Sequence, residues 1–104
     1  MCSPGTEVDI NGSKAENHCI SSSSDTYHND DWISVEFLVF SDSIVHQIIK
    51  RDTVISYSNI RLGGTYLSDN FTDKIDQPLK EGYISLQSEG HPIEFRNIKI
   101  KEFD

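Results

Sequence analysis

The stretch from Trp32 to Phe40 (WISVEFLVF) constrains the fold of this chain more than any other part of its sequence. In an extended strand, successive side chains point to opposite faces, so alternate residues share a face. One face would carry Ile33, Val35, Phe37 and Val39, and the other would carry Trp32, Ser34, Glu36 and Leu38. Apolar residues occur on both faces, which predicts a strand that is partly covered on each side.

Two shorter runs continue this pattern. Residues 44–49 (IVHQII) fit a helix or a strand by pattern alone, but the run is short and lies between polar turns, which favours a strand. Residues 53–58 (TVISYS) extend the predicted meander. The composition agrees, because the chain has 13 Ile and five Val against a single Ala, and β-branched residues fit a pleated sheet better than a helix.

Residues 6–20 are predicted to form a hairpin around Asn11-Gly12, the strongest short-range hairpin signal. In that register Cys19 lies opposite Pro4, and Cys2 is two positions away. A bulge near Pro4-Gly5 would close the gap and allow a disulfide, and without it the two thiols stay apart. A disulfide would indicate an oxidising compartment.

The rest of the chain is divided by two polar segments. Residues 21–31 form a surface loop, and residues 63–80 form a second loop that is long for a compact domain, so we expect it to rim a binding site. Residues 83–88 (YISLQS) and 92–103 (PIEFRNIKIKEF) then predict a final hairpin. The apolar parity of its second strand changes, which indicates a bulge near Arg96-Asn97.

The charge of the chain excludes some partners. Nine basic against 17 acidic residues give a net charge of -8, which repels nucleic acid and anionic lipid.

No stretch approaches the roughly 20 apolar residues of a membrane-spanning helix, and no signal peptide opens the chain. We expect a soluble single domain over residues 1–104, whose export signal has been removed or lies outside it.

The closing stretch from Leu79 to Phe103 contains the pattern G-x-I-x-L-Q-x-x-x-H-P-[IV]-x-F-R-N-I. It resembles the 3-keto-disaccharide hydrolase family, whose members have the concanavalin A-like jelly-roll fold, and residues 2–57 agree with it more loosely. The turn at Lys50-Arg51-Asp52 departs from the Asn-Gly that members often carry there, which leaves the turn type open.

The resemblance implies an all-β, concanavalin A-like jelly-roll β-sandwich. Family domains are longer, with further strands before the part equivalent to Cys2, so this chain corresponds to a C-terminal portion. We therefore expect either a partial or reduced sandwich, or a partner chain that supplies the missing strands, because unpaired strand edges are exposed otherwise.

The resemblance also implies cleavage of disaccharides or glycosides already oxidised at C3 of one sugar. The ketone acidifies the hydrogen on C2, so a base can remove it, the C1 leaving group departs by elimination, and water then adds. This chemistry needs a base, a cation or hydrogen-bond donor at the enolate oxygen, and an acid for the leaving oxygen. No cofactor is expected, because the oxidation takes place in another enzyme.

Three side chains are candidate catalytic residues: Glu36, His18 and His91. Glu36 shares a predicted strand face with Trp32, and together they offer a carboxylate beside a ring that can stack on a pyranose. The alternative for Glu36 is a solvated outer-face residue. The two histidines can carry protons near neutral pH, although His91 can equally serve to stabilise its turn.

The candidate substrate-binding residues are Trp32, Tyr83, Gln87 and Arg96. Tyr83 and Gln87 alternate on the polar face of one predicted strand, where Gln87 offers a donor and an acceptor to a sugar or to a neighbouring strand. Arg96 either holds a keto or hydroxyl oxygen or pairs with Glu94 on the same face. No loop has the spacing of a calcium motif, so no metal is assigned.

Two functions are compatible with these features, and a structural sandwich with neither function is the remaining alternative. The first is a hydrolase that cleaves 3-keto glycosides, with carbohydrate as its partner, in an extracytoplasmic compartment (periplasmic or secreted) of a bacterium. The second is a lectin-like module that binds carbohydrate without turnover, because a fold does not determine a function.

Overall fold

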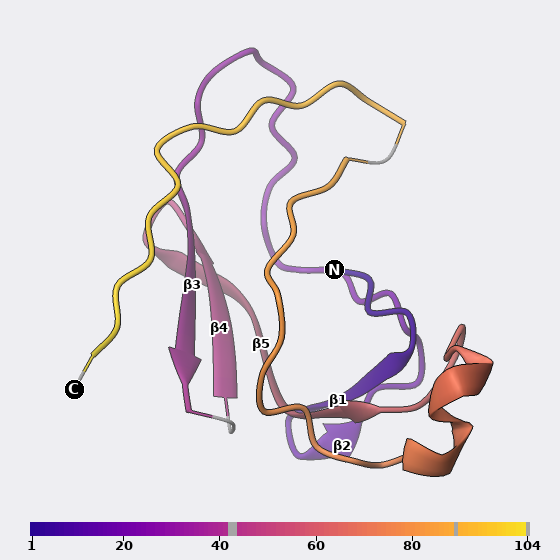
Figure 1. The fold of residues 1–104 in the computed structure, drawn as a ribbon. Coiled ribbons are helices and arrows are strands. Elements are labelled where there is room, and N and C mark those ends of the chain that lie inside the picture. Colours follow the sequence, from indigo (N-terminus) through magenta and orange to yellow (C-terminus); the bar gives the residue numbers. More distant parts are fainter. Residues whose placement is uncertain (42–43, 89, 104) are drawn as a thin grey trace.

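The computed structural model describes residues 1–41, 44–88 and 90–103 and shows a nearly all-β chain (Figure 1). A single antiparallel sheet has the strand order β2-β1-β5-β4-β3. Its strands are β1 (Thr6–Ile10), β2 (Ser13–Lys14), β3 (Val35–Phe40), β4 (Ile44–Ile49) and β5 (Asp52–Leu62), followed by a short 3₁₀-helix, η1 (Asp69–Lys74). The predicted all-β fold is confirmed, and one open sheet is consistent with part of a jelly-roll sandwich.

The central strand β5 connects the two halves of the sheet. Its first part pairs with β4 and its last part with β1, and Ser58 faces a residue of each. The register with β4 shifts near Val54, where one additional residue of β5 is inserted, and the Val54 carbonyl accepts a hydrogen bond from the Ser23 amide at 2.8 Å. This bulge allows both Val54 and Ile55 to be buried, and together with Val8 and Val45 they form a small core.

Two tight turns have the same backbone geometry despite different sequences. Asn11 and Gly12 between β1 and β2 have φ values of 53° and 81°, as a type I′ turn requires. Lys50 and Arg51 between β4 and β5 have φ values of 49° and 73°. Strand pairing therefore imposes the type I′ geometry on two residues that seldom adopt it alone.

The N-terminal hairpin has the predicted register, since Asp9 faces Lys14, but β2 ends at Lys14 rather than at residue 20. Cys2 and Cys19 form a disulfide, so the open question of their pairing is settled in favour of a bond. The irregularity that closes the gap is a turn in which the Thr6 amide donates to the Ser3 carbonyl at 3.1 Å.

The predicted cover of the longest apolar strand is wrong for one of its two faces, although Leu38 on the other face is half-buried. The strand begins at Val35 rather than at Trp32, and the side of it that carries Val35 and Phe37 is open, with these residues 50% and 60% exposed. The reason is that the described strands form one sheet, so no second sheet of described residues covers this side of β3.

The predicted C-terminal hairpin is also absent. Residues 83–88 and 92–103 run as extended chain with no strand pairing among the described residues. In the view of Figure 1 the orange part rises from the region of β5, and the yellow part then crosses the top and descends on the side of β3. Their apolar side chains, such as Ile84 and Ile100, are exposed. A strand forms only where a partner backbone satisfies its N–H and C=O groups, so alternation alone did not produce one.

The loop at residues 63–80 has more structure than predicted. It contains η1, whose N-cap Ser68 accepts a hydrogen bond from the Asn70 amide at 3.5 Å. The chain then returns along β5, where the Leu62 amide donates to the Gln77 carbonyl at 3.0 Å. In the part of the chain that the structure describes, no helix is long and apolar enough to cross a membrane.

Candidate functional site

A polar depression of about 350 Å³ lies at the end of the sheet formed by β1 and β2. Its lining combines two carboxylates (Glu7 and Glu16), an ammonium group, an imidazole and several hydroxyl or amide groups. A second depression, at the start of β5, has no histidine among its described lining residues. The polar residues that line it include Ser3, Thr6, Glu7, Lys14, Asn17 and His18. Of the sequence-predicted catalytic residues, this is where His18 lies.

Glu7 is the best-buried charged side chain of this depression, with 14% of the side chain exposed. Its carboxylate lies 2.9 Å from Lys14 Nζ and 3.7 Å from Arg61 Nε. The backbone at Gly63 and Gly64 passes close to it, so a Cβ at these positions would lie 3.3 Å and 3.1 Å from Glu7 carbon atoms. The glycine pair therefore lets the loop after β5 cover Glu7.

Asp9 lies two residues after Glu7 on β1, and the carboxylates of both residues contact the Arg61 guanidinium. The Asp9 carboxylate accepts hydrogen bonds from Asn59 Nδ2 at 3.0 Å and from Arg61 Nη1 at 3.1 Å. The hydrogen bond from Asn59 is the largest influence and lowers the pKa of Asp9 below its ordinary value. Desolvation, the next largest, opposes it, and the hydrogen bond from Arg61 and the charge of Arg61 lower the pKa further. This carboxylate is ionised at neutral pH and orients Arg61.

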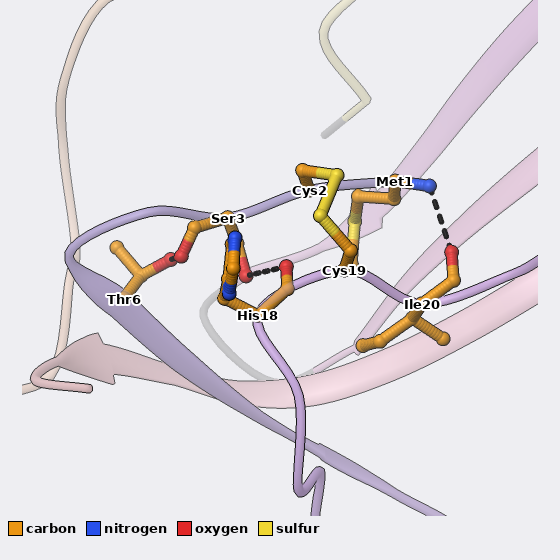
Figure 2. The surroundings of a disulfide bond; sticks show 7 residues. All are labelled: Met1, Cys2, Ser3, Thr6, His18, Cys19 and Ile20. Carbon is orange, nitrogen blue, oxygen red and sulfur yellow. Dashed lines mark hydrogen bonds between the residues drawn. A yellow bond between two sulfur atoms is a disulfide. The ribbon is translucent and has the colours of Figure 1, made fainter. Parts of the chain in front are cut away.

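The backbone around His18 is held at several points (Figure 2). The His18 carbonyl accepts hydrogen bonds from the Ser3 amide at 2.7 Å and from Ser3 Oγ at 3.3 Å. The neighbouring Cys19 is bonded to Cys2, and the N-terminal ammonium donates to the Ile20 carbonyl at 2.8 Å. The His18 ring meets the ring of Tyr66 edge to face, with centroids 5.3 Å apart. The imidazole is thus presented on a fixed backbone.

The three predicted catalytic residues do not converge. Glu36 is exposed on β3, at the opposite edge of the sheet from the hairpin that leads to His18. His91 is exposed in the extended C-terminal stretch. Their catalytic roles stay predictions, and in this structure only His18 lies in the depression.

Two of the predicted substrate-binding residues are brought together. The Arg96 guanidinium lies over the Trp32 ring, 4.0 Å from its centroid, so the C-terminal stretch contacts the segment before β3 rather than pairing Arg96 with Glu94. Tyr83 and Gln87 are exposed elsewhere on that stretch. Their roles in binding also stay predictions.

The sequence reasoning missed Lys14 and Tyr66 and assigned Glu7 no catalytic role. The signal that could have found this site is the Gly63-Gly64 pair, because adjacent glycines often mark a close approach of the backbone to another group. Among the described residues, no group of three or more His, Cys, Asp and Glu side chains could hold a metal ion.

The hydroxyl, amide, carboxylate, ammonium and imidazole groups of the depression can both donate and accept hydrogen bonds. Comparison with known families is more specific. Residues 4–101 match the model of the 3-keto-alpha-glucoside-1,2-lyase-like domain, and the chain belongs to this family. The resemblance inferred from the sequence is thereby confirmed. No curated protein and no solved structure matched the chain.

Proposed function

We propose that this domain cleaves glycosides that carry a ketone at C3 of one sugar, by removing the C2 proton and eliminating the C1 substituent. The family match over residues 4–101 supports the reaction class, since the family is described by a 1,2-lyase activity on 3-keto-glucosides. The observation that carries the choice of site is the depression in which His18, Lys14 and Glu7 lie together.

In this proposal His18 takes the proton from C2, and the electron pair moves to the C3 oxygen as an enolate. The ammonium group of Lys14, held by Glu7 at 2.9 Å, stabilises that oxygen. The enolate then collapses, the bond between C1 and its oxygen breaks, and the imidazolium returns a proton to the leaving oxygen. Water adds at C1 afterwards, so the net reaction is hydrolysis.

A carbohydrate-binding module without turnover is the second candidate. It is favoured by the separation of Glu36 and His91 from His18, because only one of the three predicted proton carriers lies at the depression. The same hydroxyl and amide groups would then serve to bind a sugar, and no base would be needed.

The deciding experiment is incubation of the chain with 3-keto-trehalose and with trehalose while glucose release is followed. We expect release from the keto substrate alone, and a loss of about 10²-fold or more in kcat for His18→Gln. His28→Gln is the matched control, because His28 is an exposed histidine in the loop before β3.

Glu36→Gln and His91→Ala complete the set. A loss of turnover in either of them, with His18→Gln unaffected, would move the site away from the depression. Binding of both sugars without glucose release would favour the binding module.

An extracytoplasmic location accompanies this function, and the disulfide between Cys2 and Cys19 supports it because such bonds persist in oxidising compartments.

A partner chain that supplies further strands is supported by the open edge of β3 and by the exposed apolar residues of 83–103. Light scattering on the purified chain measures whether it is monomeric; a monomer over the whole micromolar range would contradict self-association as the source of these strands.

A further inference from the structure

Tyr66 has an unusual position beside the depression. It directly follows Gly64 and Thr65, which line the depression, and its ring lies against His18. Yet the residue is 74% exposed, so the ring is not part of the core. Packing against the protein interior does not account for an aromatic side chain here.

The backbone of Tyr66 is also strained. Its φ of 66° lies in the left-handed region, which a bulky residue rarely adopts because its side chain crowds the backbone there. The conformation is imposed by its neighbours, because the Gly5 amide donates to the Thr65 carbonyl at 2.7 Å and the Gly63 amide donates to the Gly5 carbonyl at 3.1 Å. These two bonds hold the loop against the start of β1 and direct the Tyr66 side chain outward beside His18.

We propose that Tyr66 is the stacking platform of the site, on which the apolar face of a pyranose rests while its hydroxyl groups meet the polar lining of the depression. This inference takes its ligand class from the proposed function. An open aromatic face suits the C–H face of a sugar, and the phenol hydroxyl at the edge of the ring stays in water. The contact with His18 then sets the position of the sugar relative to the imidazole.

The test is binding of trehalose and of 3-keto-trehalose, measured by saturation-transfer NMR and titration. Tyr66→Phe should bind as the wild type does, because the ring supplies the contact. Tyr66→Leu should bind about tenfold more weakly, because it keeps apolar volume but loses the flat face. Tyr27→Leu is the matched control, since Tyr27 lies away from the depression with the Lys50 ammonium over its ring.

Tyr66→Asn separates a binding role from a structural one. Asparagine tolerates the left-handed conformation, so this variant should be at least as heat-stable as the wild type and still bind sugar about tenfold more weakly. A lower melting temperature together with unchanged sugar binding would overturn the inference and make Tyr66 a structural residue. Absence of any saturation transfer to either sugar in the wild type would overturn it as well.

The proposed function can fail separately. Sugar binding that depends on Tyr66 without glucose release supports the platform and rejects the lyase reaction. Glucose release that is equal in the wild type and in Tyr66→Leu, with equal KM, supports the reaction and rejects the platform.

Discussion

Removal of the disulfide should destabilise this chain strongly. In the double variant Cys2→Ser and Cys19→Ser, the loop closed by the bond, with a sequence separation of 17, is released in the unfolded state. Loop-closure entropy for a separation of that size corresponds to about 3 kcal/mol at 25 °C. The backbone hydrogen bonds between the same segments, such as that from the Ser3 amide to the His18 carbonyl, remain available in the variant. The expected loss is therefore that of the covalent link alone.

This loss is large for a chain in which the core of the described residues consists of four buried apolar side chains. Total stabilities of domains are about 5–15 kcal/mol, so about 3 kcal/mol is a substantial fraction. Urea unfolding followed by far-ultraviolet circular dichroism measures it, and the wild type with an excess of reductant serves as the control, which should match the double variant. A loss below about 1 kcal/mol, with an unchanged dependence on urea, would refute the entropic argument.

Three further predictions concern Asp9, the loop glycine beside Glu7 and the C-terminal stretch. The pKa of Asp9 is lowered from 3.8, mainly by its hydrogen bond from an asparagine side chain, so its stabilising effect is present above about pH 4 and lost as the pH falls through the lowered value. The urea concentration at half-unfolding should therefore fall less below pH 4 in Asp9→Asn than in the wild type. Parallel plots of this concentration against pH for the two proteins would contradict the prediction. Gly64→Ala should lower the stability of the fold by more than Gly12→Ala. Both alanines would cost about 1–2 kcal/mol because φ is positive at these positions, but only Gly64→Ala places a methyl group 3.1 Å from Glu7 Cγ. Equal melting temperatures of the two variants would exclude the clash. Arg96→Gln should change the fluorescence of the single tryptophan, over whose ring Arg96 lies, and an unchanged emission spectrum would show that this contact is not formed in solution.

Local features of the sequence were sufficient for part of the fold. The Asn11-Gly12 turn, the strand at 44–49 and the all-β character all follow from short-range preferences: positive φ at two adjacent residues, a short run between turns, and β-branched side chains. The family could also be recognised, because its pattern is contiguous between residues 79 and 103.

The candidate site was accessible only in part. His18 was identified as a titratable residue in the hairpin, but its neighbours Glu7, Lys14 and Tyr66 come from two strands and a distant loop. Sequence proximity does not show that the loop after β5 returns to cover β1. Glu36 was chosen because alternation placed it beside an aromatic residue, whereas the sheet order placed it at the opposite edge.

The sequence by itself determined which segments can be strands, where the Asn-Gly turn lies and to which family the chain belongs. Only the tertiary structure decided that Cys2 meets Cys19, that Lys50 and Arg51 adopt a left-handed turn, and that the described residues of 83–88 and 92–103 have no strand pairing. The physical reason is the same in each case. Side-chain preference is a property of one segment, but a disulfide, a turn imposed by strand pairing and a paired strand all require a second segment at the right distance.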